Sequence, residues 1–264
     1  MERFELARDA VIKAGEALRQ CHLDKSEVER KSGHQDLVTY WDRETEQFLR
    51  RRILSAFPQD SVVGEEYPPE EHSPSGMTWY LDPIDGTTNF INQHRNYAIS
   101  VGCWKGGEPL FGMVLDVERR CLYWGKHGGG AWRNQTPIHV SDRNRIPELL
   151  VTTPGIQKTF LEDHPYRDWL IRLARDVRGV RSLGSVALEL CEVAAGEADL
   201  FAALRSSPWD HNGARIILEE AGGAVYSLDG RPLPLQTKST VLAVNDEKLM
   251  EELRKRYWEG QGEV

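Results

Sequence analysis

The sequence lacks any apolar run that approaches the roughly 20 residues of a membrane-spanning helix. Its first residues, Met1-Glu2-Arg3-Phe4, begin an amphipathic acidic segment and not a signal peptide. Of its 264 residues, 40% are hydrophobic and 28% are charged, which is ordinary for a globular protein. These features predict a soluble protein with no membrane partner, and the cytoplasm is its expected location.

Cysteine is also scarce, and the basic residues are outnumbered by the acidic ones. The cysteines, Cys21, Cys103, Cys121 and Cys191, show no metal-ligand spacing, so they are interpreted as buried free thiols. The net charge of −8 argues against sequence-independent nucleic-acid binding, which depends on a basic surface. Even the run Arg50-Arg51-Arg52 is interpreted as a solvated helix face. If such an acidic chain acts on a phosphate, bound metal ions must supply the local positive charge.

No pattern typical of a nucleophilic triad is present. Ser182 and Ser185 lie in Arg-Ser-Leu-Gly-Ser and not in Gly-x-Ser-x-Gly, and the histidines form no His-Glu-x-x-His cluster. His211, beside Asp210, is interpreted as a surface or helix-start histidine. A hydrolase with this sequence is therefore expected to use water directly, without a covalent phosphoenzyme.

The most informative stretch covers residues 79–90. A β-prone segment delivers Asp82 and Asp85, and Pro83 is expected to end that strand. The following Gly86-Thr87-Thr88-Asn89 is rich in residues that open helices. Carboxylates suit Mg²⁺, and a helix N-terminus attracts anions. Taken alone, however, the pattern is explained equally well by two capping aspartates.

Two further acids extend this pattern. Glu65 follows the β-prone run 61–63, and Asp210 precedes a helix-like segment over 213–223. Singly, Glu65 fits a solvated loop acid and Asp210 fits a helix N-cap. With Asp82 and Asp85 they supply the several anions that a two-metal site needs around cations about 4 Å apart.

These residues resemble the signatures of the inositol monophosphatase family, which are Mg²⁺-dependent, lithium-sensitive sugar phosphatases, and the bacterial-type inositol-1-monophosphatases in particular. The segments that carry the resemblance are Glu65, 82–90, Trp209-Asp210, Gly213-Ala214 and 220–223, together with Lys31, 36–39, Asp42, 181–185 and 195–199. The two main signatures lie far apart and in the family's order. With the other segments, the resemblance covers nearly the whole chain.

The resemblance implies an α+β fold, a layered α-β-α-β-α sandwich of the inositol monophosphatase and fructose-1,6-bisphosphatase type. Periodicity agrees with it. Helices are expected at 4–18, 45–57, 166–177, 186–194, 213–221 and 247–257, and strands at 62–63, 79–81, 97–104, 110–117, 122–124, 149–152, 199–203, 224–228 and 240–244. We expect residues 1–140 to form an antiparallel-rich half with most metal ligands, and residues 141–264 to form an α/β half.

The resemblance also implies the ligands of two Mg²⁺ ions and a third, weaker one. Glu65, Asp82 and the carbonyl of Ile84 would hold the first ion. Asp82, Asp85 and Asp210 would hold the second, with Asp82 as the bridge. Glu65 would touch the third.

The expected catalytic residues are Asp42, Thr87 and Glu65. The resemblance implies that Asp42 and Thr87 orient the attacking water, although both residues also fit helix caps. The backbone N–H groups of Gly86 and Thr87 would receive the phosphate. The expected substrate-binding residues are Gly86, Thr87, Asp85, Ser182, Ala203, Arg205 and Asp210.

Substrate selectivity is the open part of this prediction. Animal-type, inositol-selective members carry an acidic residue at the position of Ala203, seven residues before Asp210. Arg205, two residues further on, either meets a second anionic group or faces solvent. The expected function is an inositol-1-monophosphatase with a broad range of small phosphorylated metabolites. Fructose 1,6-bisphosphate, the phosphate of NADP and, less favoured, histidinol phosphate remain alternatives.

Two expectations concern partners. Family relatives are commonly homodimers, and Trp104, Trp124 and Trp132 give the β-rich half more aromatic surface than a small sheet needs, unless they are core. A function of another class, a regulatory protein-binding module that retains the site, is the remaining alternative.

Overall fold

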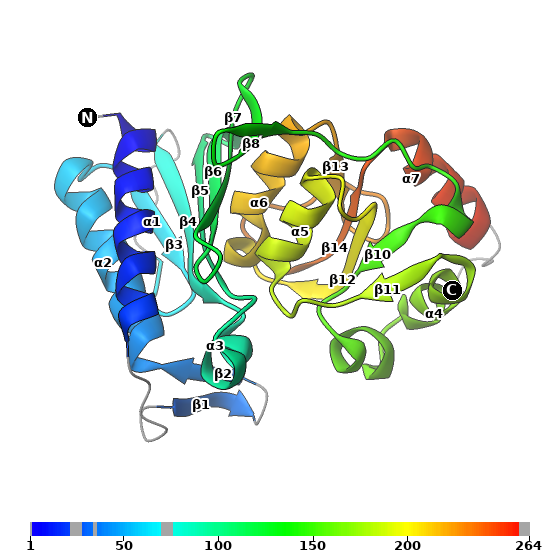
Figure 1. The fold of residues 1–264 in the computed structure, drawn as a ribbon, viewed down its shortest axis with the longest axis horizontal. Helices are drawn as coiled ribbons and strands as arrows, with labels where there is room; N and C mark the ends of the chain where they lie inside the picture. Colours follow the sequence, from blue (N-terminus) through cyan, green and yellow to red (C-terminus); the bar gives the residue numbers. More distant parts are fainter. Residues whose placement is uncertain (1, 22–27, 34–35, 70–75, 259–264) are drawn as a thin grey trace.

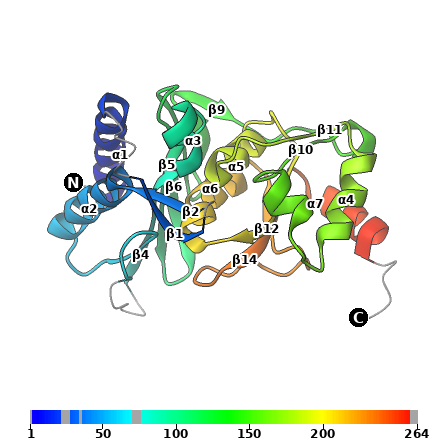
Figure 2. The ribbon, with the colours of Figure 1, turned by 90° about the horizontal axis from the view of Figure 1, so that it is seen from below.

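The computed structural model describes residues 2–21, 28–33, 36–69 and 76–258. It has five layers (Figure 1), and Figure 2 shows them from below. The outer helices α1 (Arg3–Gln20) and α2 (Tyr40–Ala56) cover a seven-stranded sheet. Helices α5 (Val186–Ala194) and α6 (Pro208–Glu220) separate it from a five-stranded sheet, which α4 (Arg167–Asp176) and α7 (Glu247–Leu253) cover on its far side. The predicted α-β-α-β-α sandwich is confirmed.

The seven-stranded sheet has the order β3-β4-β5-β6-β7-β8-β9, and every neighbouring pair except the parallel β3–β4 is antiparallel. Its strands are β3 (Ser61–Gly64), β4 (Met77–Asp85), β5 (Ala98–Lys105), β6 (Glu108–Asp116), β7 (Cys121–Lys126), β8 (Gly130–Arg133) and β9 (Thr136–Ile138). Strands β8 and β9, and the separate hairpin of β1 (Val28–Gly33) and β2 (Asp36–Thr39), were not expected from the sequence.

The prediction that Pro83 ends its strand is wrong, because β4 continues to Asp85. The pairs Asp82 with Ser100 and Asp85 with Ala98 are separated by an irregularity in the register. A proline has no N–H to give to the ladder, and such an irregularity removes the need for one. Both aspartates therefore remain fixed to β5.

The five-stranded sheet has the order β11-β10-β12-β14-β13. Its strands are β10 (Leu150–Thr152), β11 (Gly179–Arg181), β12 (Leu200–Ser206), β13 (Ala224–Tyr226) and β14 (Ser239–Val244). Strand β10 is parallel to β11 and β12, whereas β14 is antiparallel to β12 and β13. Other elements are the helix α3 (Thr87–Gln93) and the short segments η2 (Ile146–Glu148), η3 (Gln157–Leu161) and η4 (Arg254–Trp258).

The two sheets share the α5–α6 layer, and α6 lies unusually close to the first sheet. A Cβ atom added to Gly112 of β6 would lie 2.0 Å from the carbonyl oxygen of Gly213 in α6. Only glycine allows this approach, which holds the middle of α6 directly against β5 and β6. A helix from the second half of the chain thereby completes a site that begins on the first sheet.

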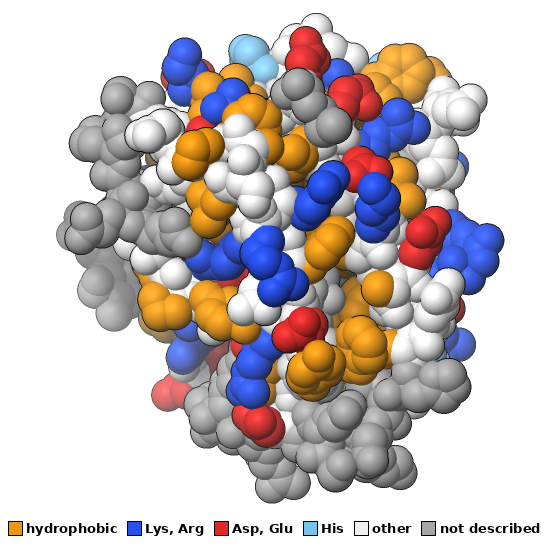
Figure 3. Space-filling view, turned by 90° about the vertical axis from the view of Figure 1, so that its left-hand side faces the viewer, with side chains coloured by type: hydrophobic (Ala, Val, Ile, Leu, Met, Phe, Trp, Pro, Cys, Tyr) orange, Lys and Arg blue, Asp and Glu red, His pale blue; other side chains and the backbone are white. Residues whose placement is uncertain are grey.

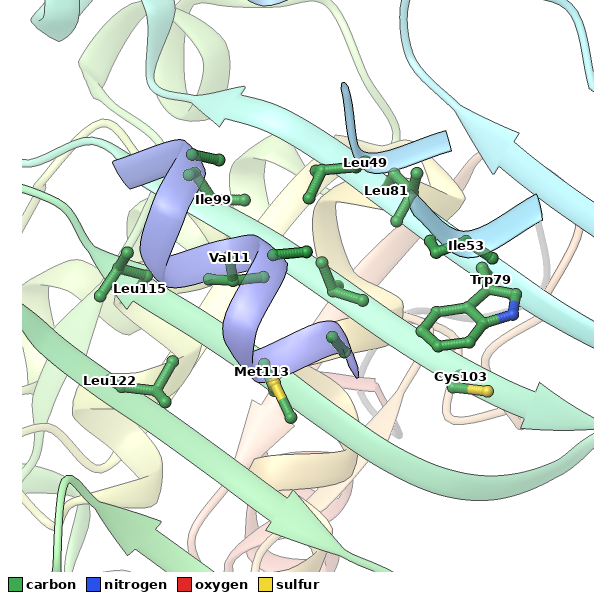
Figure 4. Packing of buried hydrophobic residues seen from close by; sticks show 14 of the residues in the cluster. Val11, Leu49, Ile53, Trp79, Leu81, Ile99, Cys103, Met113, Leu115 and Leu122 are labelled. Atoms are coloured by element: carbon green, nitrogen blue, oxygen red, sulfur yellow. The ribbon is translucent and has the colours of Figure 1, made fainter. Parts of the chain in front are cut away.

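Hydrophobic burial holds α1 and α2 on the sheet. Figure 4 shows the packed side chains Val11 of α1, Leu49 and Ile53 of α2, and Trp79, Leu81, Ile99 and Met113 of the sheet. Burying such a side chain stabilises the fold by about 1.5 to 3 kcal/mol. The apolar spacing of residues 4–18 is confirmed as the buried face of α1.

Several smaller sequence interpretations can be compared with the structure. Cys103 and Cys191 are buried free thiols, whereas Cys21 and Cys121 are only half-buried. The arginine run is not uniformly solvated: Arg51 is exposed, but Arg50 is buried against Glu46, because a buried carboxylate needs a charged partner. The outer face of α1 and α2 mixes basic, acidic and apolar side chains (Figure 3).

Trp104 is buried and donates its indole N–H to the carbonyl of Asn212 at 3.3 Å, so it belongs to the core. Trp124 and Trp132 stack on each other, with ring centroids 5.5 Å apart, and are half-buried. Among the described residues, no helix is long and apolar enough to cross a membrane.

Candidate active site

A cavity of about 530 Å³ lies at the end of β4, beside the beginnings of α3, α5 and α6. Its walls include the four acidic residues that were expected to bind metal ions, Glu65, Asp82, Asp85 and Asp210. Ile84, Gly86 and Thr87 also line it. The expected metal ligands and the expected phosphate-binding backbone therefore border one cavity.

Asp42 and Thr87 lie in contact, as expected. The Thr87 hydroxyl is 3.1 Å from Oδ1 of Asp42 and 3.1 Å from the carbonyl oxygen of Ile84, so its single proton is given to one of them at a time. Asp42 is not the N-cap of α2. Thr39 holds that position, and its backbone N–H donates to Oδ2 of Asp42 at 2.7 Å in a capping box. The same carboxylate thus caps α2 through one oxygen and meets Thr87 through the other.

Asp85 joins the two halves of the chain. Its Oδ2 accepts hydrogen bonds from the hydroxyl of Ser185 at 2.7 Å and from the backbone N–H of Ala187 at 2.6 Å, at the beginning of α5. Ser185 is the N-cap of α5. Burial raises the pKa of Asp85 to about 6, against the lowering effect of these hydrogen bonds.

Sequence reasoning missed Ser185 and favoured Ser182 instead. Ser182 is exposed and, among the described residues, is not part of the cavity wall. The N-cap position before residues 186–194 was the available signal, because serine is a preferred cap of such a helix.

Glu65 is carried by a loop that Glu46 of α2 holds in place. Oε2 of Glu46 accepts the backbone N–H of Glu66 at 2.7 Å, and Oε1 pairs with Nε of Arg50 at 2.7 Å. A Cβ atom at Gly64 would lie 2.1 Å from Glu46 Oε1. Glu46 was not identified from the sequence, because a lone acid on a helix gives no signal of the loop that it contacts.

Asp210 is the third residue of α6 and not its N-cap. Ser207 is the N-cap, and its backbone N–H donates to Oδ2 of Asp210 at 2.7 Å. His211 is completely buried, so the expectation of a surface position is wrong, although it does lie near the start of the helix. Its Nδ1 lies 2.8 Å from the Ser206 hydroxyl, and burial lowers its pKa to about 3, which keeps the ring neutral.

The acidic side chains repel one another. Burial raises the pKa of Asp82 well above its usual range, and the charges of Glu65, Asp85, Asp210 and Asp42 raise it further. Burial is also the main reason why the pKa values of Asp42 and Asp210 rise to about 6 and about 7. Such a concentration of partly buried carboxylates calls for cations to neutralise it.

The donor set fits a hard divalent cation. Carboxylate oxygens and the Ile84 carbonyl are the ligands that Mg²⁺ prefers. Within the described ranges, however, no group of three or more His, Cys, Asp or Glu side chains is arranged so that it could hold a metal ion as it stands. One oxygen each of Asp82, Asp85 and Asp210 accepts a hydrogen bond from a backbone N–H instead.

The cations Lys158, Arg205 and Lys238 of the second half of the chain also line the cavity, and the part that they line is called the second wall. Ala203 is completely buried in β12 among apolar residues, and it is not one of the described residues that line the cavity. Arg205 is exposed, and its Nε lies 3.2 Å from Glu162. The selectivity position expected from the sequence is thus two residues away from the side chain that reaches the cavity.

The five-layered fold and the matching family model make this chain a phosphomonoesterase. The chain belongs to the inositol monophosphatase family, whose model matches residues 2–261. Members of that family are in general Mg²⁺-dependent and act on phosphorylated small metabolites.

Similar proteins support this assignment. The chain is 38% identical over 244 residues to the inositol-1-monophosphatase of Bacillus subtilis, covering 91% of each chain. It is 36% identical over 231 residues to the fructose-1,6-bisphosphatase/inositol-1-monophosphatase of Aquifex aeolicus, covering 87% of this chain and 86% of that one. The crystal structure of inositol monophosphatase-II from Staphylococcus aureus superimposes with a TM-score of 0.86 at 32% identity, over 98% of this chain and 94% of that one.

Proposed function

We propose that this protein is a Mg²⁺-dependent inositol-1-monophosphatase that also accepts other small phosphate esters. The observation that carries the proposal is that Glu65, Asp82, Asp85 and Asp210 border one cavity with Thr87, which contacts Asp42. Glu65, Asp82 and the Ile84 carbonyl would hold one Mg²⁺, and Asp82, Asp85 and Asp210 a second, with Glu65 touching a weaker third. Bound Mg²⁺ would lower the pKa of a water molecule and stabilise the leaving oxygen.

Asp42 and Thr87 position the attacking water in this proposal. When the Thr87 hydroxyl donates its proton to Asp42 at 3.1 Å, its lone pairs are free to accept a hydrogen bond from a water in the cavity. Thr39 fixes Asp42 from the other side. The water is therefore oriented by a hydroxyl that cannot rotate away without breaking a buried contact.

Phosphate binding is assigned to the backbone of Gly86 and Thr87, which border the cavity at the start of α3. Backbone N–H groups carry no proton to lose and need little reorganisation during the reaction. Asp85 and Asp210 would lie beside the bound ester, and Ser182 remains the least supported of the substrate contacts because it lies outside the described cavity wall.

The substrate range follows from the second wall. With an alanine at position 203, no carboxylate from that position accepts hydrogen bonds from the hydroxyls of inositol, so discrimination among polyol phosphates is expected to be modest, about 1 to 3 kcal/mol. Fructose 1,6-bisphosphate is the second candidate, favoured by the cations on this wall and by the two activities for which the Aquifex relative is named. The phosphate of NADP and histidinol phosphate rank below it.

The test is phosphate release from inositol 1-phosphate, glycerol phosphate, fructose 1,6-bisphosphate, NADP and histidinol phosphate in the presence of Mg²⁺. We expect measurable turnover of several esters, with inositol 1-phosphate among the best. A preference for inositol 1-phosphate of more than about a thousandfold over every other ester would refute the broad range.

We further propose a homodimer. The stacked, half-buried Trp124 and Trp132 lie on neighbouring strands near the outer edge of the first sheet. Sedimentation at micromolar concentration should give about twice the chain mass of 30.1 kDa. A single species at the chain mass would reject the dimer, because a stable dimer remains associated at that concentration.

A further inference from the structure

The second wall of the cavity carries more positive charge than phosphate hydrolysis at the carboxylates requires. Lys158 comes from η3, Arg205 from the end of β12, and Lys238 directly precedes β14. Strands β12 and β14 pair through Ser206 and Ser239, so the neighbouring Arg205 and Lys238 project from the same end of two adjacent strands. Segment η3 packs against β12. The three cations therefore gather on one side of the cavity.

Only one of these cations is neutralised by an acidic side chain. Arg205 pairs with Glu162 at 3.2 Å, whereas Lys158 and Lys238 form no ion pair with the acids of the described ranges. Both lysines are exposed, in a protein whose net charge is −8. Lys158 lies near enough to Asp210 that its charge acts on that carboxyl group. Two unpaired lysines thus face a cavity whose other wall is acidic.

The scissile phosphate does not account for this arrangement. In the proposed reaction that phosphate lies at the Gly86–Thr87 backbone and the carboxylate wall, on the first-sheet side of the cavity. A volume of about 530 Å³ leaves room for the remainder of a sugar-sized substrate. A neutral polyol would accept weaker hydrogen bonds from the two ammonium groups than a phosphate, whose negative charge also attracts them.

We propose that Lys158 and Lys238, with Arg205, form a subsite for a second phosphate group, so that a small bisphosphorylated metabolite binds more tightly than the same metabolite with one phosphate. This inference rests on the proposed phosphatase function. It assigns the two lysines, which the sequence did not single out, a larger part in selectivity than Arg205, because Glu162 already occupies Arg205.

The test compares two esters that differ only in the second phosphate, fructose 1,6-bisphosphate and fructose 1-phosphate, in wild type, Lys158→Gln, Lys238→Gln and the double variant. We expect kcat/KM for the bisphosphate to fall about three- to tenfold for each lysine, mainly through KM, and more for both together. The value for fructose 1-phosphate should stay within about twofold. Raising the salt concentration should shrink the difference, since these charges are exposed.

Two controls sharpen the comparison. Lys105→Gln removes an exposed lysine at the end of β5, away from the cavity wall, and should change neither ester. Glu162→Gln frees Arg205 from its ion pair and should raise kcat/KM for the bisphosphate alone.

Equal losses for both esters in the lysine variants would overturn the subsite, since they would show that the lysines only balance the charge of the carboxylates. The dissociation constants of both fructose phosphates, measured by calorimetry with Ca²⁺ in place of Mg²⁺, decide the same question without turnover. If wild type releases phosphate neither from these esters nor from inositol 1-phosphate, the proposed phosphatase function fails, whereas equal wild-type affinities for the two fructose phosphates would overturn the subsite alone.

Discussion

The two walls of the cavity are built in different ways. The first-sheet wall takes Asp82, Ile84, Asp85, Gly86 and Thr87 from one continuous stretch, at the end of β4 and the start of α3, and only Glu65 and Asp210 of its acidic residues come from elsewhere. The second wall takes single side chains from η3, β12 and the approach to β14. A short motif can supply most of the residues for catalysis, whereas the residues for substrate selectivity come from segments that only the fold brings together.

The two walls also differ in the charge and burial of their side chains. The first wall concentrates buried carboxylates whose pKa values burial raises, and the second wall carries exposed cations. Buried charges interact strongly and exposed ones weakly. Changes in the first wall should therefore have much larger effects than changes in the second.

The largest effect is expected for Asp85→Asn, which removes one ligand charge and weakens the contact between β4 and α5. Activity should fall by about a thousandfold or more while the circular dichroism spectrum is retained. Ser185→Ala is the comparison variant: it removes the 2.7 Å hydrogen bond to Asp85 and the N-cap of α5 but leaves the Asp85 carboxylate in place, so it should cost far less activity. A folded Asp85→Asn protein with wild-type turnover would contradict the ligand role.

Glu46→Ala tests the support of the first wall. The change removes the carboxylate that neutralises buried Arg50 and accepts the Glu66 N–H, so the free energy of unfolding should fall by about 3 kcal/mol. Activity should fall as well, because Glu65 loses its fixed loop. Urea unfolding measures the first effect. The exposed neighbour Arg51→Ala should leave stability within about 0.5 kcal/mol, and equal losses in the two variants would reject the special role of Glu46.

Glu189 of α5 holds the loop that contains Leu183 and Gly184, which precedes α5. Its Oε1 accepts the backbone N–H groups of Leu183 and Gly184, and burial raises its pKa to about 8. Because the folded protein binds this proton more tightly than the unfolded chain, stability is greatest below the unfolded pKa, near 4.5, and falls as pH rises toward 8.

Glu189→Gln, which imitates the protonated acid, should remove about 3 kcal/mol of this pH-dependent loss. Thermal unfolding of the Mg²⁺-free protein between pH 5 and pH 8 provides the measurement. A wild-type slope that persists unchanged in Glu189→Gln would show that another group is responsible.

The smallest effect is expected for Arg205→Gln. Since Glu162 already neutralises this exposed arginine, kcat/KM should change less than about threefold for any ester. Kinetics with glycerol phosphate and fructose 1,6-bisphosphate provide the measurement. A larger loss for the bisphosphate than in Lys238→Gln would reverse the proposed ranking of the cations.

Much of the fold could be predicted from the sequence, because the spacing of apolar residues differs between helices and strands. The helix over residues 186–194 and the strands on either side of the turn at 105–108 follow directly from apolar spacing. The short strands β8, β9 and β11 were missed because each contains a glycine or a proline, whereas the equally short β10 and β13 consist of residues without these two.

The residues of the site also differ in how far the sequence could identify them. The motif singled out Asp82 and Asp85, which line the cavity, and the family resemblance predicted the contact between Asp42 and Thr87. Glu46, Ser185, Lys158 and Lys238 were missed because each acts on residues distant in sequence or from a different element. Ala203, which the resemblance put at the selectivity position, is buried in β12, and spacing from Asp210 cannot reveal burial.

The most direct test of the central claim is phosphate release from inositol 1-phosphate by the wild-type protein, with Mg²⁺ and with excess EDTA. If the carboxylates of the first wall work through bound metal ions, release should be rapid with Mg²⁺, absent in EDTA, and restored when Mg²⁺ is added back. Turnover that continues undiminished in EDTA would contradict this account of the site.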